Sequence, residues 1–183
     1  MSLNVSSVPA RQVAISSAIR SWTVNSWPPI RGAACGGTHR LFGIGYAYQM
    51  REQEGLPVEG EFARAKQYTE SYHRYAWTLQ NPDGSFSTEW FARRANRNDL
   101  ERKLQTTGHI LEWLVQSLPD DQLSDPKVIK SVDFVATALA REPNRPWSIG
   151  PLGHALHALV IYEQRVFGAA PPEPADTLAD TEQ

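Results

Sequence analysis

The sequence predicts an all-α protein with paired inner and outer helices. Apolar residues recur every three or four positions through most of the chain, which is the spacing of amphipathic helices. Segments that are apolar on nearly every face alternate with segments that are apolar on one face only. A buried helix has the first pattern and a helix that covers it has the second, so the alternation indicates two layers of helices.

Composition limits the number of domains and the class of partner. The chain has 183 residues, of which 41% are hydrophobic, so we expect one domain over residues 10–168. Disordered segments are expected at 1–9 and 169–183. The net charge of −2, without a basic cluster, argues against a nucleic-acid partner. No apolar run approaches the roughly 20 residues of a membrane span.

Cysteine content predicts the compartment. Cys35 is the only cysteine, which excludes a disulfide within the chain and favours a reducing environment. The first residues lack a basic segment followed by an apolar one, so no signal peptide is predicted. We therefore expect a cytoplasmic protein.

Three helices are predicted in the first half of the chain. The first covers residues 10–23. The second covers 38–53, with Thr38 as its cap, and its apolar residues on nearly every face indicate burial. The third covers 59–80 and is amphipathic, which is typical of an outer helix and places His73 on the surface.

A turn and an extended segment follow the third helix. Residues 81–84 (Asn-Pro-Asp-Gly) have the composition of a turn, and 85–97 are expected to run extended. Asn98 and Glu101 have the spacing of a capping box. They predict that a fourth helix begins here and runs to about Leu118.

Two further helices are predicted, and one helix is expected to be interrupted. The small and polar residues 106–108 predict a break in the fourth helix. Asp125 and Pro126 are typical of a helix start, and the apolar spacing continues to Arg141. The last helix, between residues 150 and 168, is broadly apolar and is expected to belong to the buried layer.

A short pattern recurs at the expected start of each inner helix. A small residue precedes a histidine, and a leucine follows two positions later, at intervals of 70 and 45 residues. Internal repeats of this length are typical of stacked helix pairs. The three occurrences are Gly37-Thr38-His39-Arg40-Leu41, Thr107-Gly108-His109-Ile110-Leu111 and Leu152-Gly153-His154-Ala155-Leu156.

One segment carries a resemblance to a known superfamily. Leu79-Gln80-Asn81-Pro82-Asp83-Gly84-Ser85-Phe86 resembles the Gln-Asn-Pro-Asp-Gly-Ser-aromatic turn of the terpenoid-cyclase and protein-prenyltransferase superfamily. In that superfamily the glutamine caps one helix and the aromatic residue packs under the next. Residues 38–167 resemble the inner and outer helices of its α/α toroid. The chain is short for a complete ring, so the resemblance implies a partial α/α toroid.

The resemblance does not extend to the catalytic motifs of that superfamily. The Asp-x-Asp-Asp motif of the triterpene cyclases is missing, and Asp120-Asp121 does not replace it. The Asp, Cys and His zinc ligands of the prenyltransferases have no matching motif. No reaction is therefore implied.

The repeated histidines are the leading candidates for a site. If the inner helices are roughly parallel, His39, His109 and His154 converge at one end of a shared cavity. Imidazole serves as an acid, a base or a zinc ligand, and Cys35 lies four residues before His39. The alternative is that each histidine packs at a helix start and bonds a backbone carbonyl. No residue is assigned to a metal, and any cofactor is unknown.

Other side chains are assigned to the same site. Glu112 lies three residues after His109, where it orients that ring or acts as a base. The other interpretation of Glu112 is a solvated residue on the helix surface. The other interpretation of the aromatic residues is that they pack in the core. The predicted catalytic residues are His39, His109, His154 and Glu112, and the predicted ligand-binding residues are Tyr46, Trp113 and His157.

The leading hypothesis is a domain that binds or acts on a small organic ligand, isoprenoid- or saccharide-like, in a cavity lined by histidine and aromatic residues. Whether it is an enzyme stays open. The alternative is a non-catalytic protein-interaction or structural module, as a homo-oligomer or as part of a longer chain.

Overall fold

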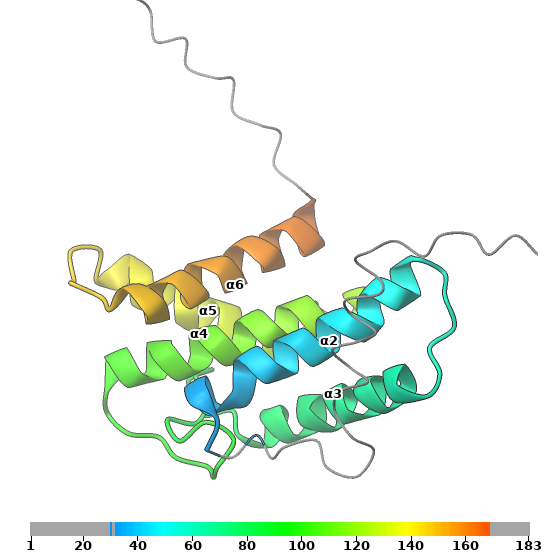
Figure 1. The fold of residues 1–183 in the computed structure, drawn as a ribbon. Coiled ribbons are helices and arrows are strands. Elements are labelled where there is room, and N and C mark those ends of the chain that lie inside the picture. Colours follow the sequence, from blue (N-terminus) through cyan, green and yellow to red (C-terminus); the bar gives the residue numbers. More distant parts are fainter. Residues whose placement is uncertain (1–29, 31, 169–183) are drawn as a thin grey trace, which may run out of the picture.

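The computed structural model describes residue 30 and residues 32–168, and these fold almost entirely into helices (Figure 1). This part of the chain contains no strand, and its isolated bridge pairs Gln80 with Phe86. The predicted all-α class is confirmed. The expected helix over 10–23 and the expected disordered ends lie outside the described residues. The elements are η1 (Ala34–Gly37), α2 (Thr38–Gln53), α3 (Glu61–Thr78), α4 (Leu100–Ser117), η2 (Asp120–Gln122), α5 (Pro126–Arg141) and α6 (Ile149–Phe167).

Helix α4 is the centre of the described fold. It contacts α2, α3, α5 and α6, and α6 runs alongside it over the longest stretch (Figure 1). Its side chains supply half of the largest fully buried groups, including Leu104, Ile110 and Trp113. Burial of such side chains stabilises each by about 1.5–3 kcal/mol. The other helices are therefore positioned by the faces they present to α4.

The close approach of α4 and α6 depends on a glycine. A Cβ added at Gly108 would lie 3.0 Å from both the Cα and the backbone N of Ala155. The expected break at 106–108 is wrong, because α4 is continuous from Leu100 to Ser117. Gly108 serves close packing, and Thr106 bonds its hydroxyl back to the Arg102 carbonyl inside the helix (3.0 Å).

The caps of α2 and α4 differ from the prediction by one residue. Asp99, not Asn98, accepts the first-turn N–H of Arg102. The cap of α2 is Gly37, at φ 85°, and Thr38 instead donates its hydroxyl to the Cys35 carbonyl (2.9 Å). The Asp125 cap of α5 is confirmed, with Pro126 as the first helical residue.

The turn after α3 is fastened to α5. The Gln80 amide donates to the Lys127 carbonyl (2.7 Å) and to the Ser131 hydroxyl (2.8 Å). Ser131 in turn donates to the Gly84 carbonyl (2.8 Å). Gly84 has φ +90°, and an added Cβ would lie 2.2 Å from the Lys130 carbonyl oxygen. Only glycine fits this contact.

The segment 85–97 is a loop held against α4. The backbone N–H of Phe86 donates to the Thr107 hydroxyl (2.9 Å), and the Phe86 ring is fully buried. Turns and bends occupy residues 88–93, so the continuous extended run expected over 85–97 is not found.

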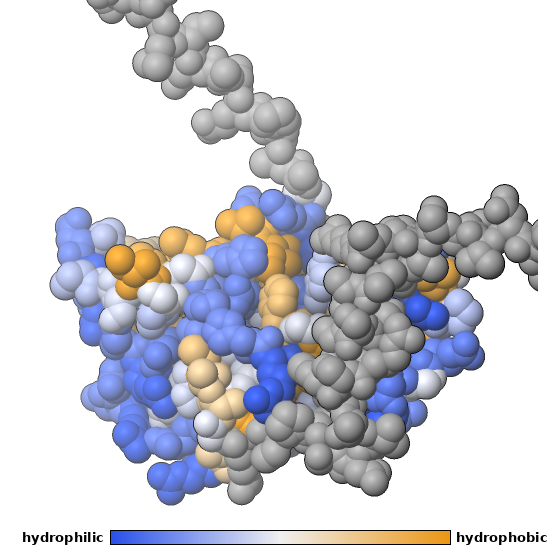
Figure 2. Space-filling model, viewed as in Figure 1, coloured by the Kyte–Doolittle hydropathy of each residue, from blue (hydrophilic) through white to orange (hydrophobic). Residues whose placement is uncertain are grey.

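Helix α6 is more exposed than predicted. Of its residues only Ala155 and Ala158 are buried, so its expected place in a buried layer is wrong. Apolar surface lies along the edge of the molecule that α6 forms (Figure 2). The exposed large apolar side chains of α6 are Ile149, Leu156, Val160, Val166 and Phe167.

Candidate functional site

Three helices bring their histidines to one place. The ring centroids of His39 and His154 are 5.1 Å apart, those of His39 and His109 are 5.6 Å apart, and those of His109 and His154 are 3.7 Å apart. His39 lies in the first turn of α2 and His154 near the start of α6. His109 lies in the middle of α4, because that helix begins earlier than the repeat indicated.

The close contact between α4 and α6 explains why two of the rings stack. Gly108 of α4 meets Ala155 of α6. His109 is the neighbour of Gly108 in the sequence and His154 is the neighbour of Ala155, so the contact brings the two histidines together. The two rings are tilted by 32° to each other. The stacking of His109 on His154 therefore follows from a packing contact of the backbone.

His109 is held in one tautomer. Its Nδ1 donates to the Gln105 carbonyl (2.7 Å), because a carbonyl can only accept, and Nε2 then carries a lone pair. Burial lowers the pKa of His109 to about 4, and His154 and His39 add to that effect. The Gln105 hydrogen bond and the Glu112 carboxylate oppose it without reversing it. His109 is therefore a neutral imidazole at pH 7. For His109, the structure shows the bond to a backbone carbonyl that was the alternative to a role in a site.

Glu112 binds the two histidines of α6. One carboxylate oxygen lies 2.7 Å from Nδ1 of His154, and the other lies 2.6 Å from Nδ1 of His157. The Glu112 side chain is 12% exposed, so the carboxylate and its bond to His154 are partly shielded from water, whereas the bond to His157 is exposed. The prediction that Glu112 orients His109 is wrong, because its carboxylate reaches across to α6.

A small cavity adjoins these groups. Its volume is about 260 Å³. Four of its lining residues are among the predicted site residues, namely His39, Glu112, His154 and His157. Thr38 and Phe42 complete the lining. Phe42 was missed by sequence reasoning, although its position one turn after His39 on α2 was a usable signal.

Two of the predicted ligand-binding aromatic residues lie elsewhere. Trp113 is fully buried in the core, where its ring packs on His73 (4.9 Å) and Phe91 (5.9 Å between centroids). Tyr46 lies two turns beyond His39 on α2 and does not line the cavity. The core alternative considered for the aromatic residues is the one observed for Trp113.

An aromatic side chain from the loop before α4 contacts the histidines. The Trp90 ring stands at 90° to the His109 ring, with 5.3 Å between centroids. Trp90 has φ 54°, in the left-handed region that a bulky residue rarely adopts. Its position depends on the tertiary fold of the loop, so sequence periodicity gave no signal for it.

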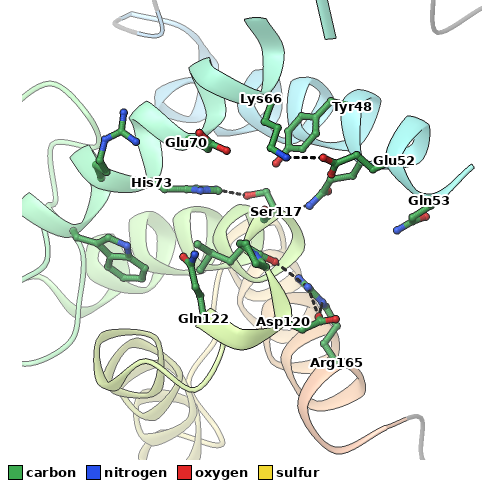
Figure 3. Close-up of a pocket in the computed structure, with 15 residues that line it drawn as sticks. Tyr48, Glu52, Gln53, Lys66, Glu70, His73, Ser117, Asp120, Gln122 and Arg165 are labelled. Carbon is green, nitrogen blue, oxygen red and sulfur yellow. Dashed lines mark hydrogen bonds and ion pairs between the residues drawn. The ribbon is translucent and has the colours of Figure 1, made fainter. Parts of the chain in front are cut away.

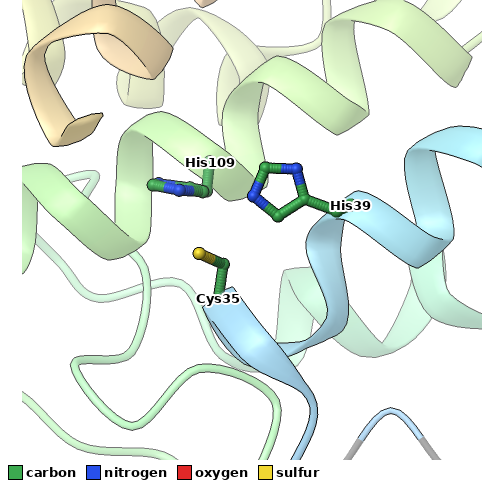
Figure 4. A group of neighbouring side chains, drawn as sticks. All are labelled: Cys35, His39 and His109. Atoms are coloured by element: carbon green, nitrogen blue, oxygen red, sulfur yellow. The ribbon is translucent and has the colours of Figure 1, made fainter.

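A group with metal-ligating chemistry lies beside the cavity. The sulfur of Cys35 and one ring nitrogen each of His39 and His109 all lie within 4.8 Å of one another (Figure 4). His109 is buried, Cys35 is half-buried and His39 is exposed. Sequence analysis had assigned no residue to a metal.

A second cavity of about 650 Å³ lies at the other end of α4 (Figure 3). It is lined by His73 and Ser117, whose Nε2 and Oγ atoms are 2.7 Å apart. His73 was expected on the surface, yet it is only 7% exposed, so that expectation is wrong. Sequence reasoning missed this cavity because its residues come from separate segments without a shared motif.

The His73–Ser117 pair does not have the arrangement of an activated nucleophile. Ser117 donates its only hydroxyl proton to the Trp113 carbonyl (2.7 Å). His73 must then donate from Nε2 to the serine oxygen, which is the reverse of what a general base does. Burial, with a smaller effect from Arg74, lowers the pKa of His73 to about 4, so the ring is neutral at pH 7. The pair is a structural contact.

Comparisons with protein-family models, with curated proteins and with solved structures found no match to this chain. The superfamily resemblance of residues 79–86 therefore stays an expectation. Among the described residues, no helix combines the length and the apolar character that crossing a membrane requires.

Proposed function

We propose that this chain binds and acts on a small organic ligand in the cavity lined by His39, Glu112, His154 and His157. One observation carries the proposal: helices from three separate parts of the chain place imidazoles and a shielded carboxylate around one cavity. Polar groups gathered in this way cost desolvation energy on folding. A ligand that uses their hydrogen-bonding capacity accounts for their presence.

The lining favours a saccharide-like ligand over an isoprenoid one. Of the six lining residues, Phe42 alone is apolar, and the others offer imidazole, carboxylate and hydroxyl groups. The volume of about 260 Å³ is near the lower end of ligand pockets, which suits one sugar ring or a molecule of similar size. An isoprenoid chain would need an apolar wall.

Glu112 prepares the α6 histidines for hydrogen bonding. The carboxylate accepts from Nδ1 of His154 and His157, and in the neutral tautomer of each ring Nε2 is then an acceptor. A ligand hydroxyl can donate to such a nitrogen. Transfer of that proton is the general-base role predicted for these histidines.

Binding to a defined panel tests this proposal. Saturation-transfer NMR would compare glucose, galactose and cellobiose with geraniol and farnesol on the wild-type protein. We expect at least one saccharide to bind, and Glu112→Gln to weaken that binding by about 10- to 100-fold, because charge-assisted hydrogen bonds contribute about 1.5–3 kcal/mol.

Glu163→Gln is the matched control, because Glu163 is an exposed glutamate of α6 outside the cavity. It should bind the same saccharide as the wild type does. Absence of saccharide binding, or equal binding by the two variants, would refute the proposal.

The same proposal includes a partial α/α toroid and a cytoplasmic location. Support for the toroid comes from the turn at 80–86, where Gln80 bonds the first turn of α5 and Phe86 is buried against α4. The burial of Phe86 matches the role that the superfamily resemblance implies for the aromatic residue, whereas Gln80 bonds α5 without capping it, because Asp125 is the cap. The single cysteine supports a reducing compartment.

A second candidate function is a protein-interaction module. It is favoured by the exposed apolar side chains of α6, because large exposed apolar patches are uncommon on monomers. Sedimentation velocity over a range of concentrations tests self-association through this face. A monomer at all concentrations would remove the homo-oligomer from consideration.

A further inference from the structure

We propose that Cys35, His39 and His109 bind a divalent transition metal ion, and that Zn²⁺ fits them best. The proposal is independent of the organic ligand, because the metal would bind whether or not the neighbouring cavity holds one. It begins from the three ligand atoms that lie within 4.8 Å of one another (Figure 4).

The donor set selects the class of metal. One sulfur and two imidazole nitrogens suit zinc and similar transition metals, whereas calcium and magnesium take oxygen ligands. Zinc binds sulfur at about 2.3 Å and nitrogen at about 2.0–2.1 Å, so tetrahedral ligands lie roughly 3.3–3.7 Å apart. The present separations, all within 4.8 Å, exceed this by at most about 1.5 Å. Rotation of the exposed His39 side chain can shorten its two distances, and closure between Cys35 and His109 would need a small shift of the half-buried Cys35 side chain.

His109 is already in the form that a metal requires. Its Nδ1 donates to the Gln105 carbonyl, which fixes the ring and leaves Nε2 free to coordinate. Metal-ligating histidines generally donate their other ring nitrogen to a carbonyl or a carboxylate in this way. The Gln105 bond therefore has a role in the site beyond the stability of α4.

Cys35 is held in place by close packing. It adopts φ 50°, and the two following glycines also have positive φ. A Cβ on Gly36 would lie 2.5 Å from the Trp90 side chain, and one on Gly37 would lie 2.3 Å from Ile30. The loop is thus packed between these two residues with its backbone strained. It presents the sulfur toward the two rings (Figure 4).

A fourth coordination position adjoins the cavity. His39 is both a proposed ligand and a lining residue, so a metal bound to it would lie at the edge of that space. Water, or a ligand in the cavity, would take the fourth position. Three protein ligands with one open position are typical of catalytic zinc. On binding, the Cys35 thiol gives up its proton to solvent and coordinates as thiolate.

Metal titration of the untagged, reduced and chelator-stripped full chain tests the proposal. Cobalt(II) is the probe, because a thiolate ligand produces a charge-transfer absorption in the near ultraviolet, and zinc would then displace it. We expect one equivalent to bind. Cys35→Ser should abolish that absorption and weaken zinc binding by about 100-fold or more, since even supporting residues cost 10- to 100-fold.

Two further variants make the result specific. His39→Ala should weaken zinc binding as strongly as Cys35→Ser, and because His39 is exposed its loss should leave the circular dichroism spectrum unchanged. Glu163→Gln is the control, since Glu163 is an exposed residue of α6 that belongs neither to the cavity nor to the proposed ligand set.

The proposal is overturned if the wild-type protein binds no stoichiometric cobalt or zinc. It is also overturned if Cys35→Ser or His39→Ala retains the full affinity of the Glu163→Gln control. No organic ligand enters the titration, so its outcome is separate from that of the saccharide experiment.

Discussion

At the scale of single residues, His73 shows how burial controls the charge of a side chain. Its ring packs on Trp113 and donates to Ser117, with 7% of its surface exposed. The pKa falls from the ordinary 6.5 to about 4, chiefly because burial disfavours the charged form. The unfolded chain therefore takes up a proton in a pH range where the folded chain does not.

This difference predicts a loss of stability in mild acid. Because the unfolded state binds more protons between pH 6.5 and 4, the free energy of unfolding is highest above 6.5 and falls toward 4. His73 alone can contribute up to about 3 kcal/mol to that loss. His73→Gln removes this contribution, so we expect urea midpoints of the variant to change less than those of the wild type between pH 7.5 and 4.5.

The comparison is made on the slope with pH, because the variant also loses packing against Trp113 at pH 7.5. Equal declines for the two proteins would contradict the account of His73.

The surface position expected for His73 was wrong for an identifiable reason. The buried face of α3 carries Ala65, Thr69, His73 and Ala76, and two of these four are polar. Hydrophobic periodicity follows apolar residues, so it placed the buried stripe along the tyrosines instead. Only the tertiary contact with Ser117 reveals why a histidine is buried here.

At the scale of elements, the contact between α4 and α6 positions the site. Gly108 lets α6 approach so closely that the rings of His109 and His154 stack at 3.7 Å. A methyl group at Gly108 would meet backbone atoms of Ala155, which cannot move aside as a flexible side chain can.

We expect Gly108→Ala to destabilise the protein by about 1–3 kcal/mol, although alanine is the better helix former. Gly43→Ala on α2 is the matched control, because its Cβ would meet nothing within 4 Å. That variant should gain up to about 1 kcal/mol. Urea denaturation followed by circular dichroism measures both, and a stable Gly108→Ala protein would show that the helices are not in close contact.

Helix positions were largely predictable, and helix environments were less so. The range 38–53 was predicted as found, and 59–80 differs from Glu61–Thr78 by two residues at each end, because caps, prolines and apolar spacing are local signals. The continuity of α4 and the exposure of α6 depend on which helix packs on which. Such information is not contained in the local sequence.

At the scale of the whole molecule, three distant segments form one polar site around α4. The repeated histidine pattern predicted that the rings of His39, His109 and His154 would meet, and the structure places them together. Their catalytic role stays a prediction. The repeat could not predict that Glu112 binds α6, because this depends on the rotation of α6 about its axis.

The direction in which the Cys35 side chain points could not be predicted from the sequence. Its spacing of four residues from His39 suggested proximity, but the left-handed backbone that directs its sulfur depends on packing against Trp90. The contact of Glu112 with α6 and the direction of the Cys35 sulfur depend on long-range packing, whereas the features that were predicted are repeats and helical spacings.

Nuclear Overhauser effects among the histidine rings test the central claim most directly. The account predicts cross-peaks that connect His109 with His154 and with His39, whose centroids are 3.7 and 5.6 Å away. The His73–Trp113 pair, at 4.9 Å, is the internal control. If the control cross-peak is present and none connects the three histidines, the shared site does not exist.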